Sequence, residues 1–217
     1  MQIQISVTSD FVCPWCYIGE KRLARAIERL ATGIDVQVQW LPFELNPDMP
    51  PEGMDRGTYL SRKFGSGERA QAIQAQTVLA GRDDGTTFHY EAIKRTPNTF
   101  LAHRVSRLAQ REGKQRAFVE ATLQAYFAHG RDIGSKGVLA EIASGIGLDR
   151  DAVAAFLSSD AGVESVRALE RTALERGVQG VPYFDIGGIA IVGAQPAETL
   201  LQTIIEAGRR HAPRPAV

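Results

Sequence analysis

The chain has 217 residues, and its 25 lysine and arginine residues balance 25 aspartate and glutamate residues, so its formal net charge is zero. A hydrophobic content of 44% and a charged content of 23% are ordinary for a globular protein that buries a substantial core. The charge balance argues against a nucleic-acid-binding protein, which would be basic. The sequence contains no run approaching the roughly 20 apolar residues of a membrane-spanning helix, so we expect neither nucleic acid nor a membrane as partner.

The N-terminal residues, MQIQISVTSD, lack the basic and apolar regions of a secretory signal. We therefore expect a cytoplasmic protein. The alternative is a mature form whose signal has been removed, which the initial Met1 disfavours.

The first elements follow from a change of hydrophobic period. Ile3, Ile5 and Val7 alternate with polar residues, which predicts a strand. Apolar residues then recur at helical spacing, and Pro14 suits the first turn of that helix because its missing N–H is no loss there. Alternation returns at residues 36–40, which predicts a second strand.

The middle of the chain is helical in pattern. Residues 42–54 are rich in proline and predict irregular structure. Seven helices are then predicted, at residues 55–64, 68–82, 99–111, 114–129, 135–144, 149–158 and 161–176. Residues 183–186 and 189–192, joined by two glycines, predict a hairpin, and a last helix is predicted from Pro196 to about residue 207.

This order predicts an α/β protein with a thioredoxin-like fold. Without residues 46–158, the remaining elements run β-α-β and then β-β-α, which is typical of the thioredoxin architecture. We therefore expect a thioredoxin-like domain formed by residues 1–45 and 159–217. A large all-helical insertion domain, residues 46–158, separates its two halves.

The two cysteines of the chain, Cys13 and Cys16, are one helical turn apart at the predicted start of a helix. A disulfide between them closes too small a loop to stabilise the fold, so they indicate local chemistry. Unpaired N–H groups at the helix N-terminus stabilise a thiolate. We expect Cys13 to be the exposed nucleophile and Cys16 the shielded resolving thiol of a disulfide exchange reaction.

A bare CxxC also fits half of a zinc site, and inert packing is a further alternative. Structural zinc needs two more ligands at familiar spacing, and the histidines do not supply such a pair: His89, His103, His129 and His211. A single CxxC between a strand and an amphipathic helix favours redox chemistry. We expect no metal and no bound cofactor.

Pro182 immediately precedes the late hairpin. An ordinary trans proline at a strand start is one interpretation. In the thioredoxin architecture, however, a cis-proline loop at this place faces the CxxC. We therefore predict a cis Val181–Pro182 bond, with Val181 offering its backbone to an extended substrate.

Four segments carry a family resemblance: DFVCPWCYIG, WLPFELNP, NTFLAHR and GVQGVPYF. Together they resemble the FrnE-type branch of DsbA-like oxidoreductases, which is related to 2-hydroxychromene-2-carboxylate isomerases and kappa-class glutathione transferases. The resemblance covers residues 7–195. It implies that Cys13 and Cys16 of the CPWC motif are the active dithiol and that Val181 and Pro182 form the cis-proline loop.

The resemblance also places residues 42–47, 98–104 and 193–195 near the substrate groove. Candidate substrate contacts are therefore Pro14, Trp15, Val181, Phe43, Asn98, His103 and Gln195. The last four residues each have a structural alternative. Phe43 could be a core or groove-wall side chain, and Asn98 could be a helix N-cap. His103 could be a packed histidine, and Gln195 could belong to a plain loop. His103 is also a candidate proton shuttle, and the loop of Gln195 a candidate anion site.

Asp10 is a further candidate near the dithiol. It is interpreted as a turn residue, with an acid acting on Cys16 as the alternative.

The sequence favours a thiol–disulfide oxidoreductase acting on protein or small-molecule thiols, with glutathione as a conceivable co-substrate. A glutathione-dependent isomerase or transferase is the second hypothesis, although those relatives carry serine where this chain has Cys13. A non-catalytic binding or chaperone module is the third. Trp15 replaces the motif histidine of strongly oxidising DsbA proteins, so we expect a potential below their value of about −120 mV. The sequence leaves the substrate and the oligomeric state open.

Overall fold

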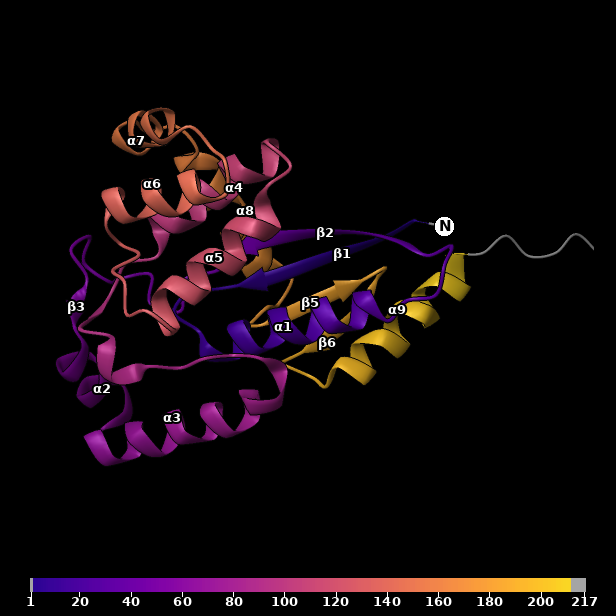
Figure 1. Cartoon of the computed structure of the whole chain (residues 1–217), viewed down its shortest axis with the longest axis horizontal. Coiled ribbons are helices and arrows are strands. Elements are labelled where there is room, and N and C mark those ends of the chain that lie inside the picture. The colour runs from indigo at the N-terminus through magenta and orange to yellow at the C-terminus, as the bar shows by residue number, and fades with distance from the viewer. Residues whose placement is uncertain (1, 212–217) are drawn as a thin grey trace, which may run out of the picture.

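A four-stranded mixed sheet forms the centre of the molecule (Figure 1). The computed structural model describes residues 2–211. The strand order is β2 (Asp35–Pro42), β1 (Gln2–Ser9), β5 (Tyr183–Ile186) and β6 (Ile189–Val192). β1 pairs with β2 in parallel and with β5 antiparallel, and β5 pairs antiparallel with β6. The predicted strands are confirmed, the second one extending further at both ends.

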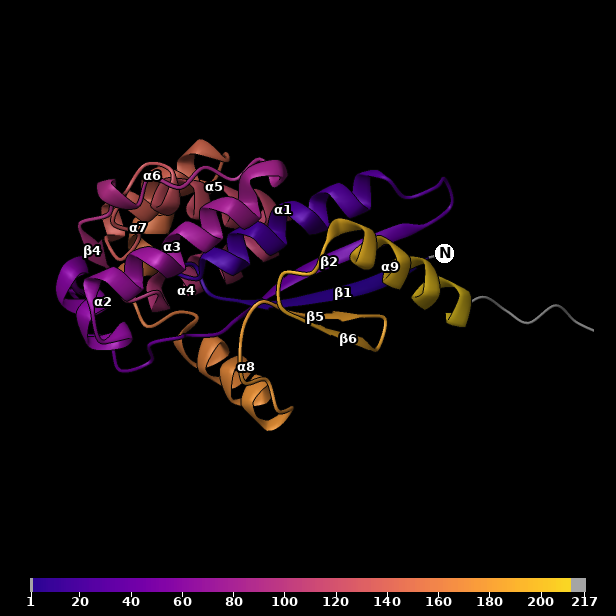
Figure 2. The same cartoon turned by 90° about the horizontal axis from the view of Figure 1, so that it is seen from below.

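Helices cover both faces of the sheet. Helices α1 (Pro14–Glu28) and α9 (Ala197–His211) lie on one side, and α8 (Val163–Glu175) lies on the other (Figure 2). Apolar and polar side chains alternate along β1, so they point to opposite faces of the sheet. Its apolar residues are buried in the core, whereas Ser6 and Thr8 line a hollow on the side of α8.

The other helices gather at the end of the sheet to which β1 points (Figure 1). They are α2 (Arg56–Phe64), α3 (Gly67–Gly81), α4 (Phe100–Arg111), α5 (Gln115–Phe127), α6 (Lys136–Gly145) and α7 (Arg150–Ser158). The seven helices predicted between residues 55 and 176 are thus confirmed to within a few residues. The prediction missed two 3-10 turns (Arg82–Asp84 and Tyr90–Ala92) and a two-residue ladder between β3 (Met54–Asp55) and β4 (Arg95–Thr96).

One hydrophobic core joins the sheet to the helical part. Buried side chains from β1 and β5, such as Ile5 and Phe184, belong to the same cluster as Phe118 and Phe127 of α5. The fold is therefore the expected thioredoxin-like α/β fold with a helical insertion. We propose that residues 1–45 and 159–217 form the thioredoxin-like part and residues 46–158 the helical insertion. Both parts contribute side chains to the same core, so this division describes the order along the chain.

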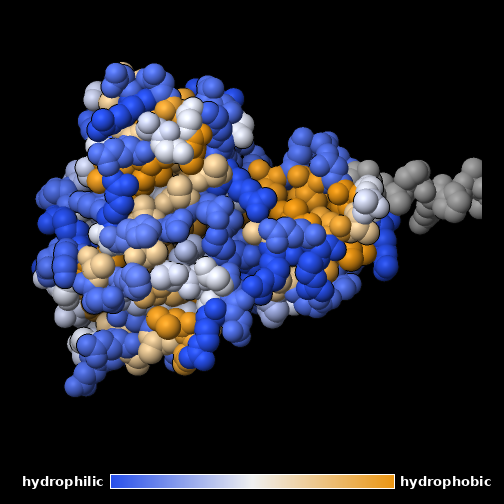
Figure 3. All heavy atoms as spheres, viewed as in Figure 1, coloured by the Kyte–Doolittle hydropathy of each residue, from blue (hydrophilic) through white to orange (hydrophobic). Residues whose placement is uncertain are grey.

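The surface of the helical part is mainly hydrophilic on the face seen in Figure 3, and an apolar area lies over β1, β2 and the end of α1. Val36 and Val38 of β2 and Ile27 of α1 are half-buried and pack on the core. Within residues 2–211 no helix is both long and apolar enough to cross a membrane.

A buried glutamate lies on α1. Only 3% of Glu20 is exposed, and burial raises the pKa of its carboxyl group from 4.5 to about 7, partly opposed by the charge of Lys21. Between pH 4.5 and about 7, the Glu20 carboxyl group is ionised in the unfolded chain but still mostly protonated in the folded protein. The contribution of Glu20 to the free energy of unfolding is therefore most favourable below pH 4.5, falls as the pH rises to about 7, and stays lower above that.

Replacing Glu20 with glutamine should remove this loss. We expect Glu20→Gln to raise the free energy of unfolding by about 1–3 kcal/mol at pH 8 and by much less at pH 5. Urea denaturation at both pH values measures the effect, with Glu28→Gln on the exposed side of α1 as the control. Equal effects of Glu20→Gln at the two pH values would contradict the proposed ionisation.

Candidate active site

The two thiols lie where β1 leads into α1. Cys13 is the N-cap residue of α1, and Pro14 follows at the first helical position. The Cys16 N–H donates a hydrogen bond to the Cys13 carbonyl at 3.0 Å, which closes the first turn. Both cysteines are free thiols, so this is the reduced dithiol at a helix N-terminus that the sequence predicts.

The expected difference in exposure between the thiols is wrong. Cys13 is 4% exposed and Cys16 is 3% exposed, so both thiols are buried. The thiols differ instead in what they face. Cys13 lines a cavity of about 320 Å³, and Cys16 is not among the residues lining it.

The surroundings of Cys16 keep it protonated. Burial raises the pKa of its thiol well above the usual value, and the hydrogen bond and charge of Cys13 raise it further. The charge of Asp10 acts in the same direction, whereas a hydrogen bond from the Asp10 backbone lowers the pKa. Cys16 is therefore a poor nucleophile until its proton is removed.

The Val181–Pro182 peptide bond is cis, as predicted. The Cys13 thiol donates to the Val181 carbonyl, with 3.6 Å between Sγ and the oxygen. The Pro182 carbonyl in turn accepts from the Gly193 N–H at 2.8 Å. A Cβ atom at Gly19 would lie 3.1 Å from Pro182 Cγ, so glycine at this position lets α1 approach the loop closely.

Helices α2 and α3 close the cavity over Cys13. Its apolar lining includes Leu45, Leu60, Phe64, Ala70 and Ile73. Its polar lining consists of Arg56, Tyr59, Lys63, Gln74, Thr77 and Tyr90, and none of the described residues that line it is acidic. Trp15, 37% exposed, belongs to the same lining. The cavity is thus apolar with two cations.

Two of these polar residues are held in place. Arg56 donates to Thr96 Oγ1 at 3.1 Å and to the Tyr126 hydroxyl at 3.3 Å. The Tyr90 hydroxyl lies 2.6 Å from Thr77 Oγ1, and burial raises the pKa of Tyr90, so its hydroxyl stays neutral. No local sequence motif marks Arg56 or Tyr90, so the sequence does not indicate either residue as part of the site.

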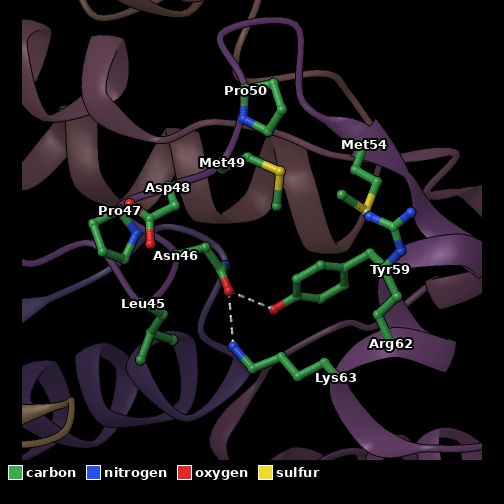
Figure 4. Close-up of a pocket in the computed structure, with 10 residues that line it drawn as sticks. All are labelled: Leu45, Asn46, Pro47, Asp48, Met49, Pro50, Met54, Tyr59, Arg62 and Lys63. Atoms are coloured by element: carbon green, nitrogen blue, oxygen red, sulfur yellow. Dashed lines mark hydrogen bonds between the residues drawn. The ribbon is translucent and has the colours of Figure 1, made fainter.

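A second hollow, of about 420 Å³, adjoins the first and shares Leu45, Tyr59 and Lys63 with it. Asn46 Oδ1 accepts from the Tyr59 hydroxyl at 3.0 Å and from Lys63 Nζ at 2.9 Å (Figure 4). These bonds orient both side chains at the boundary between the hollows.

The predicted substrate contacts divide into two groups. Pro14, Trp15 and Val181 line the Cys13 cavity. Phe43, Asn98, His103 and Gln195 do not line it. Of the three predicted groove segments, residues 42–47 reach the cavity through Leu45, and residues 98–104 and 193–195 are not among its lining.

The polar groups of Asn98 and Gln195 are used within the fold. Asn98 Oδ1 accepts from the Phe100 N–H at 2.9 Å, and its Nδ2 donates to the Met49 carbonyl. The N-cap of α4 is Thr99, so Asn98 precedes the cap position that the sequence predicts for it. Gln195 Nε2 donates to the Val192 carbonyl at 2.9 Å. The Gly193 and Gln195 N–H groups are also bonded within the chain, which leaves little of the predicted anion site.

Phe43 and His103 lie on the far side of the dithiol. Phe43 lines a hollow beside α8. His103 is 3% exposed and packs its ring against Phe11, with 4.9 Å between the ring centroids. Neither residue is among those that line the Cys13 cavity.

Asp10 is both a turn residue and an acid close enough to influence Cys16, the two interpretations that the sequence offers. Its carbonyl accepts from the Cys13 N–H at 3.2 Å, which forms a turn. Its side chain is buried and acts on Cys16 through its charge. Among residues 2–211 no group of three or more histidine, cysteine, aspartate or glutamate side chains is arranged to hold a metal ion.

Known proteins are similar to this chain in sequence and in fold. The chain is 31% identical to a probable DsbA oxidoreductase from Streptomyces coelicolor, with a TM-score of 0.86 over 99% of this chain and 94% of that one. It is 29% identical over 195 residues to the uncharacterized protein YwbO of Bacillus subtilis (strain 168), covering 89% of this chain and 92% of YwbO.

A 2-hydroxychromene-2-carboxylate isomerase has a similar fold, with a TM-score of 0.68 and 18% identity over 95% of each chain. Residues 4–205 match the family described as the DSBA-like thioredoxin domain. The CxxC at the start of α1, the cis-proline loop beside it and this match over nearly the whole length establish that the chain belongs to the DsbA-like thioredoxin family.

Proposed function

We propose that the protein is a thiol–disulfide oxidoreductase in which Cys13 attacks the substrate and Cys16 resolves the mixed disulfide. The main support is the different placement of the two sulfurs. Cys13 lines the cavity and lies 3.6 Å from the Val181 carbonyl, whereas Cys16 lies behind it with a raised pKa. Substrates are disulfides or thiols of proteins or small molecules.

The reaction has two steps. The Cys13 thiolate attacks one sulfur of a substrate disulfide, a Cys13–substrate bond forms, and the other substrate sulfur leaves as a thiolate. Cys16 then loses its proton and attacks Cys13, which forms the Cys13–Cys16 disulfide and releases the second substrate thiolate. Two electrons pass from the protein to the substrate, and the reverse sequence oxidises a substrate dithiol.

The lining of the cavity favours a particular kind of substrate. Arg56 and Lys63 supply positive charge to a cavity that no acidic residue lines. A disulfide with a carboxylate near its sulfur, such as glutathione disulfide, would complement these cations while its sulfur reaches Cys13. The same feature keeps a glutathione-dependent isomerase or transferase as the second candidate, since Cys13 could hold glutathione there.

A redox titration of the dithiol in glutathione buffers tests the proposal. We expect one reversible two-electron transition between dithiol and Cys13–Cys16 disulfide, read by alkylation and mass. Its midpoint should lie below about −120 mV, because Trp15 adds no positive charge beside the Cys13 thiolate. A stable glutathione adduct on Cys13 without an internal disulfide would instead favour the transferase or isomerase.

A further inference from the structure

A polar hollow lies on the side of the sheet that faces away from the dithiol. Its volume is about 210 Å³, and it is formed between the sheet and α8, which lies opposite to α1 (Figure 2). Ordinary ligand pockets hold roughly 300–1,000 Å³, so this hollow suits a small ligand or one group of a larger ligand. It shares no lining residue with the Cys13 cavity.

The sheet forms the floor of this hollow. Ser6 and Thr8 are two positions apart on β1 and therefore face the same side. Ser6 pairs with Asp185 of β5 and Thr8 pairs with Tyr183, and all four residues line the hollow. No hydrogen bond within residues 2–211 engages the hydroxyl of Thr8 or that of Tyr183. Both hydroxyls can therefore donate to a ligand.

Helix α8 and the turn after it form the opposite wall, which includes Thr172, Arg176 and Val178. The carbonyls at the end of a helix repel an anion when they are unpaired. Here the Thr172 carbonyl accepts from the Arg176 N–H at 3.0 Å, and the Ala173 carbonyl accepts from the Val178 N–H at 3.0 Å. These bonds remove much of that repulsion.

Arg107 of α4 reaches the hollow from the side. Its Nη1 donates to Gln110 Oε1, and Gln110 donates to Gln39 Oε1 at 3.3 Å. Gln39 in turn donates to Ser6 Oγ at 2.9 Å, so a series of hydrogen bonds connects the arginine to the floor. The Nε of Arg107 is buried without a partner among the described residues. This guanidinium is therefore desolvated and only partly satisfied.

The positive charge of the hollow is not balanced. Neither Arg107 nor Arg176 forms an ion pair within residues 2–211. Burial lowers the pKa of Arg107, and the charge of Arg111 lowers it further. Among the described lining residues Asp185 alone is acidic, and its Oδ1 accepts from the Gly188 N–H at 2.8 Å. An anion in the hollow would stabilise both arginines.

We propose that this hollow binds a phosphate group, with Arg107 and Arg176 as its counter-ions. The hydroxyls of Ser6, Thr8 and Tyr183 would donate to its remaining oxygens. Guanidinium groups match phosphate because they offer paired N–H donors, and a tetrahedral anion has enough oxygens to accept from the hydroxyls as well. Inorganic phosphate and a phosphate monoester share this chemistry.

The site is placed to act on the cis-proline loop. Val178 and Tyr183 both line the hollow, and Val181 lies between them in the chain. The Val181 carbonyl accepts from the Cys13 thiol, with 3.6 Å between Sγ and the oxygen. A bound phosphate therefore contacts the chain on both sides of the loop that faces the dithiol, whereas the binding itself does not depend on dithiol exchange.

Calorimetric titration of inorganic phosphate into the full chain, at neutral pH and constant ionic strength, tests the site. We expect saturable binding at one site per chain. Arg107→Gln and Arg176→Gln should each weaken it about tenfold or more, because each removes a charge-assisted hydrogen bond. Arg111→Gln is the matched control, because it removes the same charge from an exposed position of α4. It should change the affinity by less than about twofold.

Arg176 is exposed, so Arg176→Gln tests the site even if Arg107→Gln fails to fold. Titration with glycerol 3-phosphate distinguishes the two sources of phosphate. Binding of both ligands would support a site open to monoesters, and binding of inorganic phosphate alone would support a site for the free ion. Absence of saturable binding by either ligand would overturn the site, as would equal weakening by Arg111→Gln and Arg176→Gln.

Discussion

A Cys16→Ser variant should stop after the first exchange and accumulate a covalent adduct between Cys13 and its substrate. The reason is the separation of roles seen in the structure. Cys13 lines the substrate cavity and can attack without its partner, whereas release of the bound substrate needs the second sulfur behind it. Turnover should fall to the level of the uncatalysed exchange. Intact-mass measurement after mixing with glutathione disulfide reads the adduct directly.

Cys13→Ser is the matched variant for this experiment. It should form no adduct, because Cys16 is buried and its raised pKa keeps it protonated. An adduct on Cys16 in Cys13→Ser, or continued turnover in Cys16→Ser, would reverse or remove the assigned roles. Retained glutathione-dependent isomerisation in Cys13→Ser would favour the second candidate function.

The dithiol could be predicted because its chemistry is local. Two cysteines one turn apart, a proline between them and a change of hydrophobic period place both thiols at a helix N-terminus. The cis-proline loop could be predicted only through the architecture, since Val181 lies 168 positions from Cys13. Exposure could not be predicted, because α2 and α3, which close the cavity, pack there through contacts distant in sequence.

The groove residues show a different limit. The segment NTFLAHR predicts the start of an amphipathic helix, and α4 begins there, with Thr99 as its N-cap and Asn98 bonded to the Phe100 N–H. Helical period alone does not reveal which neighbour a polar side chain on that helix meets. His103 turns out to face Asp10 behind the dithiol, and Arg56 and Tyr90, which carry no motif, form the cavity instead.

Replacing Arg104, the neighbour of His103, should change the free energy of unfolding more than the other substitutions considered. It is 4% exposed and donates hydrogen bonds of 2.6–3.0 Å to the carbonyls of Phe156, Ser159 and Ala161. Its guanidinium also lies 5.1 Å from the centroid of the Phe156 ring. This one side chain thus fixes the end of α7 and the turn into α8.

Methionine at this position would keep most of the volume of Arg104 and remove every one of these bonds. We expect Arg104→Met to lower the free energy of unfolding by about 3–4 kcal/mol, because three carbonyls lose a charged donor in a partly buried turn. Arg111→Met, at the exposed end of α4, should change it by less than about 0.5 kcal/mol. Urea denaturation of both variants provides the comparison.

The same substitution separates stability from chemistry. Arg104 does not line the Cys13 cavity, so Cys13 of the folded Arg104→Met protein should react with an aromatic disulfide at the wild-type rate. A loss of stability below about 1 kcal/mol would show that the turn holds its shape without the arginine. A slowed reaction in the folded variant would show instead that Arg104 also influences the reactivity of Cys13, through the turn before α8 or through its neighbour His103, which faces Asp10.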